Sequence, residues 1–279
     1  MHPSRDIEQP LGALRRWTAE HGAELVQIPL SSRPRRVAEE GRVEDCQLIV
    51  SIGGDGTMLA AVRVAMADER PVLGVACGSL GALTNVEEDG VIAALDRIDA
   101  GDWRPHRLPA LEVRRSEGDS FLALNDFAVV RAGQGQIRVS AVVDGTLYAR
   151  FAGDGCVVSA PVGSSAYALA AGGPLIAPGT DAFLLTPLPA HGGFSPPLVI
   201  AAHLTLELEV AGGYGGARVE VDGQVTGLEV SVLRISLRPD VAVVVGFPDQ
   251  ESFLTGLRRR GVIRDSPRIV ADEARGLTR

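Results

Sequence analysis

Hydrophobic and polar positions follow two different patterns along the chain. Up to about residue 105, short apolar runs alternate with helical patterns. The pattern predicts helices at 7–21, 57–66 and 90–98, and strands at 25–28, 47–52 and 71–75. Buried strands that alternate with helices indicate an α/β domain with a parallel, doubly wound sheet. No strand pattern precedes the first helix, so we expect either a sheet without that edge strand or a sequence whose start was assigned late.

After Trp103 the pattern changes to short β-rich runs separated by Gly, Pro and Asp turns. These runs cover 111–114, 121–130, 137–143, 155–159, 203–210, 217–221, 228–236 and 241–245. Such spacing favours a mostly antiparallel β domain. A helical pattern at 251–260 follows. We therefore expect an α/β domain at 1–105, a β-rich substrate-binding and oligomerisation domain at 106–248, and a C-terminal segment at 249–279 whose helix packs back on the first domain.

The identity of the basic residues limits the reaction mechanisms that this chain can use. All 27 of them are arginine, and the 279-residue chain contains no lysine. This excludes Schiff-base chemistry and a Walker-type phosphate-binding lysine. The formal charge of −8 disfavours nucleic acid as a partner, because an acidic protein repels a phosphate backbone. We expect the arginine run 258–260 to lie on a solvated helix face.

Location and redox state follow from what the sequence lacks. It has neither a stretch of 18 apolar residues nor an export signal at its start, so we expect a cytoplasmic protein without a membrane partner. Cys46, Cys77 and Cys156 are widely spaced in apolar surroundings. That spacing favours reduced core thiols over a disulfide framework or a metal site.

The strongest chemical signal is the segment 51–59, where a predicted strand passes into a helix. Gly53, Gly54 and Gly56 allow a tight turn, and the N–H groups of the loop and of the following helix can bind phosphate oxygens. Asp55 in the middle of such a loop indicates a reactive role, because a carboxylate repels phosphate unless a metal or a substrate hydroxyl lies beside it. A simple structural turn is the alternative.

A second glycine-rich loop, 74–81, also follows a predicted strand, and its glycines alone could mark an ordinary strand-to-helix turn. Loops that follow neighbouring parallel strands lie at the same edge of the sheet, where ligands of such folds bind. Together the two loops predict a cleft for a polyphosphate or a dinucleotide.

Polar groups in the second half add weaker signals. Asn125 and Asp126 interrupt an apolar run and could hold the hydroxyls of a ribose, or could simply end a strand. Small residues around Tyr167 could form a slot in which a base stacks, although a core tyrosine is the ordinary reading. Asp222 to Gln224 predicts a hairpin turn.

In their order along the chain, these segments resemble the NAD kinase family. The family pattern combines a GGDGT loop, a G-x-N-x-G-x-L-G-F-L loop, an Asn-Glu pair, a DG followed by TPTGSTAY, an AGGP, a Pro-His segment and a late DGQ. The corresponding segments here are 53–57, 74–83, Asn125-Asp126, Asp154-Gly155 with 160–167, 171–174, His191 and 222–224. The resemblance covers nearly the whole chain.

The resemblance implies phosphorylation of the 2′-hydroxyl of the adenosine ribose of NAD, with ATP or polyphosphate as donor, Mg²⁺ or another divalent metal, and a homodimer or homotetramer. It implies that Asp55 is the base or a metal partner and that Asn125 and Asp126 orient the ribose. The further binding residues that it implies are Gly54, Gly56, Thr57, Asp154, Ser165, Ala166, Tyr167, Ala170, Asp222 and Gln224. No resident metal ligands are assigned.

The chain departs from the family pattern mainly around the substrate pocket. Ala76 replaces Asn, Ala82 replaces Phe, Asp126 replaces Glu, and Ala160 and Val162 replace two threonines; Pro196 replaces an Arg. Because the Asp55 loop is intact, phosphoryl transfer is expected more strongly than NAD as the acceptor. The alternatives are a lipid or sphingoid-base kinase, and a non-catalytic nucleotide-binding regulatory relative.

Overall fold

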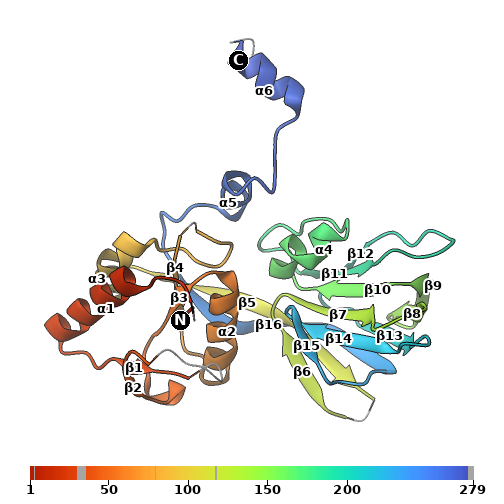
Figure 1. Cartoon of the computed structure of the whole chain (residues 1–279), viewed down its shortest axis with the longest axis horizontal. Coiled ribbons are helices and arrows are strands. Elements are labelled where there is room, and N and C mark those ends of the chain that lie inside the picture. Colours follow the sequence, from red (N-terminus) through yellow and green to blue (C-terminus); the bar gives the residue numbers. More distant parts are fainter. Residues whose placement is uncertain (3, 30–35, 79, 117, 276–279) are drawn as a thin grey trace. The chain divides into compact units, whose positions relative to one another are not determined.

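The computed structural model describes residues 1–2, 4–29, 36–78, 80–116 and 118–275 (Figure 1). The chain divides into two compact units. One comprises Met1–His106 together with Val243–Arg279, and the other comprises Arg107–Ala242. The segment 249–279 therefore belongs to the first unit together with the end of the strand that precedes it.

The first unit contains a parallel sheet with helices on both faces. Strand β3 (Ile49–Gly53) pairs in parallel with β4 (Val72–Ala76), and β4 pairs in parallel with the last part of β16 (Val232–Gly246). Helices α1 (Glu8–His21) and α3 (Val91–Asp99) lie on one face, and α2 (Asp55–Ala65) lies on the other (Figure 1). Among the described residues, α1 is the first element of the chain.

The smaller elements of this unit complete its connections. They are β1 (Val26–Gln27), β2 (Glu39–Glu40), the 3-10 turns Val43–Asp45, Met66–Asp68 and Glu88–Gly90, α5 (Phe253–Arg259) and α6 (Pro267–Ala274).

The apolar faces of α1 and α3 pack against the sheet and form one core cluster of the first unit. Ile7, Leu14, Leu73 and Leu95 are among its buried side chains. The apolar positions of α1 recur at the three- and four-residue spacing of one helix face, which is why the sequence pattern located this helix within one residue.

The second unit contains two antiparallel sheets whose facing side chains share one core. Its strands are β5 (Arg104–Arg115), β6 (Ser120–Ala123), β7 (Asp126–Arg131), β8 (Ile137–Val143), β9 (Thr146–Gly153), β10 (Gly155–Ser159), β11 (Ala182–Pro187), β12 (Leu198–Ala201), β13 (Leu206–Ala211), β14 (Ala217–Val221) and β15 (Gln224–Thr226), with the first part of β16. One sheet has the order β12-β11-β10-β7-β14-β15; in the other, β16 pairs with β13, β13 with β8 and β8 with β9. The core includes Phe127, Phe183, Leu206 and Ile235.

Several predicted strands have different bounds. The predicted strand 121–130 is wrong as a single element, because the chain leaves β6 and enters β7 in the other sheet after Leu124 and Asn125. The runs 232–236 and 241–245 belong to one strand, β16, in which Asp240 takes a φ of 53° without ending the strand, whereas 228–231 precede it. Strands β9, β11 and β12 and helix α6 were not predicted from the sequence pattern.

All three cysteines are free thiols, as predicted. Cys77 and Cys156 are buried, and burial raises the pKa of the Cys156 thiol to about 12. The expectation of a core position is wrong for Cys46, which is only half-buried.

Candidate active site

Asp55 lies at the junction between strand β3 and helix α2. The strand ends at Gly53, Gly54 is extended, and Asp55 is the first residue of the helix. The first N–H groups of a helix have no partner within it and carry partial positive charge, so this terminus suits an anion. The Asp55 side chain is half-buried, with 37% of its surface exposed.

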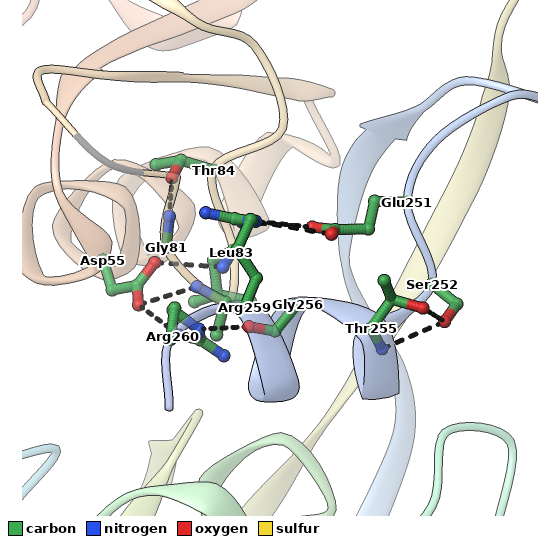
Figure 2. Close-up of polar contacts among 11 residues, drawn as sticks. Asp55, Gly81, Leu83, Thr84, Glu251, Ser252, Thr255, Gly256, Arg259 and Arg260 are labelled. Atoms are coloured by element: carbon green, nitrogen blue, oxygen red, sulfur yellow. Dashed lines mark hydrogen bonds and ion pairs between the residues drawn. The ribbon is translucent and has the colours of Figure 1, made fainter. Parts of the chain in front are cut away.

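The carboxylate of Asp55 joins the first glycine-rich loop to the second. The N–H of Ala82 donates to Oδ2 at 2.9 Å, and the N–H of Leu83 donates to Oδ1 at 3.0 Å (Figure 2). A Cβ at Gly81 would overlap this carboxylate, so only glycine leaves room for it. The second loop thus lies beside the first, as the sequence predicted; its Ser79 lies outside the described residues.

Arg260 brings a positive charge to the same carboxylate from the end of α5. Its Nη1 lies 3.7 Å from Oδ2 of Asp55, and its Nε donates to the carbonyl of Gly256 at 3.2 Å (Figure 2). The prediction that 258–260 lies on a solvated helix face is wrong for Arg260, whose side chain is 21% exposed. Sequence reasoning missed this residue because no local pattern relates 260 to 55.

The glycines on either side of Asp55 differ in what surrounds them. A Cβ at Gly53 would overlap the side chain of Thr57, which packs against it. A Cβ at Gly54 or at Gly56 would meet no atom within 4 Å. The surface beside Asp55 is therefore open at both positions, and a phosphate can approach the backbone there.

The chemistry of Asp55 is compatible with a divalent ion that also binds phosphate oxygens. Within the described ranges, no group of three or more His, Cys, Asp or Glu side chains is arranged to hold an ion. Mg²⁺ usually keeps several waters and binds through one or two carboxylates together with substrate phosphates. Asp55 is a single carboxylate whose oxygens each accept one backbone N–H, so each keeps a lone pair for such an ion.

In the second unit, Asp222 holds the segment that contains Asn125 and Asp126. Its carboxylate accepts the N–H groups of Leu124, Asn125 and Asp126 at 3.1, 2.6 and 3.1 Å. Asp222 and Gly223 form a two-residue hairpin turn with φ values of 48° and 74°. The predicted hairpin is thus present, and its aspartate fixes the turn from β6 to β7.

Asp126 is an unusual carboxyl group because it is only 4% exposed. Burial, followed by the nearby charges of Asp222 and Glu220, raises its pKa to about 7. Near neutral pH, Asp126 therefore exists both as an acceptor-only carboxylate and as an acid that can donate a hydrogen bond. Asn125 beside it is half-buried.

Asp154, Tyr167 and Ala170 line one cavity of about 620 Å³ in the second unit. Its other lining residues are Val130, Arg131, Ala132, Gly133, Ala171, Leu188 and Pro189. The Nε of Arg131 donates to Oδ1 of Asp154 at 2.6 Å. Tyr167 is half-buried and packs against the core cluster that contains Val157 and Leu184, and burial raises its pKa. The cavity has an apolar wall and a charged pair, a combination typical of small-molecule sites.

The remaining predicted residues lie outside the lining of this cavity. The hydroxyl of Ser165 donates to the carbonyl of Val162 at 3.1 Å, and Ala166 is exposed. Gln224 is exposed and pairs with Val221 across the hairpin. Sequence reasoning also missed Arg131, since an arginine at the end of a strand carries no signal by itself.

At two positions where the chain departs from the family pattern, Ala82 and Ala160, the residue forms a hydrogen bond through its main-chain N–H. Ala82 meets Asp55 through its N–H, so a small side chain there keeps this hydrogen bond. Ala160 is fully buried, and its N–H donates to the carbonyl of Asn125 at 2.9 Å. Both substitutions leave these main-chain bonds intact.

Comparisons with known proteins agree with this arrangement. Residues 11–103 match the family model of the ATP-NAD kinase N-terminal domain, and residues 124–232 match that of the ATP-NAD kinase C-terminal domain. The chain is 40% identical over 236 residues to the NAD kinase of Heliobacterium modesticaldum, which covers 78% of this chain and 82% of that protein. It is 32% identical over 238 residues to the NAD kinase of Gemmatimonas aurantiaca, which covers 80% of this chain and 81% of that protein.

Two solved structures are similar in fold. A crystal structure of an NAD kinase from Archaeoglobus fulgidus in complex with ATP has a TM-score of 0.71 and 25% identity, and the match covers 91% of this chain and 95% of that one. A crystal structure of yeast NADH kinase complexed with NADH has a TM-score of 0.77 over 92% of this chain and 85% of that one; at 20% identity it supports the fold alone.

The matched family models and the named relatives define the class of protein as a phosphotransferase. The chain belongs to the NAD kinase family. These matches do not favour the alternatives of a lipid kinase or a non-catalytic relative. In the part of the chain that the structure describes, no helix has the length and apolar character needed to span a membrane.

Proposed function

We propose that this chain phosphorylates the 2′-hydroxyl of the adenosine ribose of NAD to form NADP, with ATP as the donor and Asp55 as the general base. The observation that carries the proposal is the placement of Asp55 at an open helix N-terminus between two glycine positions. The solved NAD kinase with ATP supports the choice of donor. Polyphosphate is the alternative donor to compare in the same assay.

In the proposed reaction, the 2′-oxygen attacks the γ-phosphorus, and the bond from that phosphorus to the β,γ-bridging oxygen breaks. ADP leaves, and the hydroxyl proton passes to the carboxylate of Asp55. The N–H groups of Gly54 and Gly56 and the start of α2 stabilise charge on the phosphates. A bound Mg²⁺ would neutralise phosphate charge, with Asp55 as the residue able to hold it.

The second unit supplies the proposed acceptor site. Asn125 and Asp126 have the donors and acceptors needed to hold ribose hydroxyls, and Asp222 fixes their backbone. The cavity lined by Asp154, Tyr167 and Ala170 is large enough for a base with its ribose. We assign Thr57, Ser165, Ala166 and Gln224 to the rim of the binding site on the family resemblance.

Replacing Asp55 tests the assignment. Asp55→Asn removes the proton acceptor while the glycines still shape the loop, so kcat for NADP formation should fall by about 100-fold or more. The measurement is NADP formation from NAD and MgATP, together with the circular-dichroism spectrum. The matched control is Asp249→Asn, since the Asp249 side chain is 73% exposed and pairs with Arg97 on the surface. Near-normal NADP formation by Asp55→Asn would refute the assignment of the base.

We further propose a cytoplasmic homodimer or homotetramer on the family resemblance. Light scattering of the purified chain measures its mass in solution and decides between the two assemblies.

A further inference from the structure

The guanidinium of Arg260 is held beside Asp55 without being fully engaged by it. The separation of 3.7 Å between Nη1 and Oδ2 is longer than a hydrogen bond, and Oδ2 already accepts the N–H of Ala82 at 2.9 Å. Among the described residues, the hydrogen-bond partner of Arg260 is the carbonyl of Gly256, which accepts from Nε at 3.2 Å. A guanidinium has five N–H donors, so its outer nitrogens keep donors for a ligand.

The two neighbouring arginines in the sequence are engaged elsewhere. Arg258 donates to Asp265 at 2.9 Å, and Arg259 donates to Glu251 at 3.1 Å (Figure 2 shows the second pair). Their side chains are 52% and 38% exposed, against 21% for Arg260. Of the three, Arg260 is the one that approaches the Asp55 loop, and its charge is the least screened by solvent.

Binding of a triphosphate at this loop requires positive charge beyond the backbone N–H groups. The loop itself contains a carboxylate, and the chain contains no lysine to supply the charge. Arginine binds phosphate oxygens through two parallel N–H donors, which a single ammonium group does not offer. A cation already placed at the carboxylate, beside the open positions of Gly54 and Gly56, meets this requirement.

We propose that Arg260 binds the terminal phosphates of the donor nucleotide, and that its contact with Asp55 is the resting position from which it moves to them. This inference rests on the proposed function and assigns it a phosphate-binding residue. Binding of the phosphates draws the guanidinium from Asp55, which leaves the carboxylate for the substrate hydroxyl. The C-terminal helix α5 is thereby part of the donor site.

Steady-state kinetics of the full chain test the proposal. Arg260→Gln should raise the KM for ATP by about tenfold or more and leave the KM for NAD within about twofold. Arg260→Lys should restore part of the loss, since it keeps the charge but not the paired donors. The matched control is Arg258→Gln in the same helix, for which both KM values should stay within about twofold of wild type. Loss confined to kcat in Arg260→Gln, or an unchanged KM for ATP, overturns the proposal.

A binding measurement separates this inference from the proposed function. Inorganic tripolyphosphate is titrated calorimetrically into each protein without NAD, so no turnover is needed. Wild type and Arg258→Gln should bind it, and Arg260→Gln should bind it at least about tenfold more weakly. Equal binding by all three proteins contradicts the role of Arg260, whereas a wild type that makes no NADP contradicts the proposed function. If Arg260→Gln loses the native circular-dichroism spectrum, Arg260→Met carries the same two measurements.

Discussion

The surroundings of Asp126 strongly raise the pKa of its carboxyl group. Its carboxyl group is 4% exposed, and the charges of Asp222 and Glu220 lie nearby, so its pKa rises from 3.8 to about 7. The Asp222 carboxylate is fixed in this position, because it accepts hydrogen bonds from three backbone N–H groups of the same segment. The negative charge that fixes the backbone at 124–126 therefore also hinders ionisation of Asp126.

The raised pKa of Asp126 predicts a pH-dependent stability. The folded state binds this proton more tightly than the unfolded state does, so its contribution is fully present below pH 3.8 and is lost as pH rises through about 7. Asp126→Asn removes this dependence. From about pH 5 to about pH 8, the unfolding free energy of wild type should fall by about 2 to 3 kcal/mol relative to that of the variant.

Urea unfolding of both proteins at the two pH values checks this expectation. The Asp249→Asn variant serves as the control, because the pKa of Asp249 is lowered by its hydrogen bond with Arg97 and Asp249 stays ionised across this range. Parallel pH curves for wild type and Asp126→Asn would show that Asp126 is ionised throughout.

The sequence could indicate candidate site residues where the local structure depends on neighbours in the chain. The Asp55 loop lies within five consecutive residues, and its glycines specify the turn. Arg260 and Arg131 form ion pairs with residues far away in the sequence, and nothing in their local sequence indicates those partners. The pKa of Asp126 likewise depends on a hairpin that only the folded chain brings near.

At the scale of elements, the two glycine-rich loops act as one unit because Asp55 binds the second loop through its backbone. Leu83 and Ala82 donate to the carboxylate, and Gly81 leaves space for it. The second loop thus orients Asp55 as well as following its own strand. The sequence predicted that these loops lie at one edge of the sheet, but not that two hydrogen bonds join them.

Gly81→Ala should displace the Asp55 carboxylate and lower kcat about 100-fold, because its Cβ would overlap the carboxylate oxygens. Gly12→Ala is the control, since a Cβ there meets only a guanidinium nitrogen of Arg16 at 4.0 Å within helix α1. The control should raise the unfolding free energy by about 0.5–1 kcal/mol without changing kcat. Activity assays and thermal melts of both variants measure the difference, and normal turnover by Gly81→Ala would contradict this role of the second loop.

Strands β9 and β12 carry weak sequence signals for two different reasons. Strand β9 follows the turn Asp144-Gly145, whose φ values of 48° and 78° are those of a tight hairpin. This turn signal was present in the sequence. On one face of the strand beyond it, however, half of the residues are polar. Strand β12 has only four residues, and such short runs carry little periodic signal.

At the scale of the whole molecule, the change of pattern along the sequence correctly predicts two fold classes. The first part of the chain forms a parallel sheet with helices, and the second part forms antiparallel sheets. Alternation of strands and helices is a property of long stretches, so it survives errors in single boundaries. Residues 243–279 join the first unit from the other end of the chain, whereas the sequence pattern places the start of this C-terminal segment at 249.

Hydrogen exchange tests the assignment of substrates to the two units. ATP alone should slow exchange mainly at 53–58 and 81–84, where the helix N-terminus and the second loop lie. NAD alone should slow it mainly at 124–126 and 154–170, which carry the proposed ribose and base contacts. Peptide-resolved mass spectrometry reads both patterns. Protection by ATP confined to the second unit would contradict the donor site at Asp55.

The split of the first unit into two stretches of sequence has a consequence for synthesis. Residues 1–106 leave the ribosome first, but the end of β16 and helix α5 emerge only after the whole of 107–242. The second unit is continuous and can fold while the chain is still growing. The nascent protein thus carries Asp55 for most of its synthesis without Arg260, so the proposed donor site is completed only when the last part of the chain has been made.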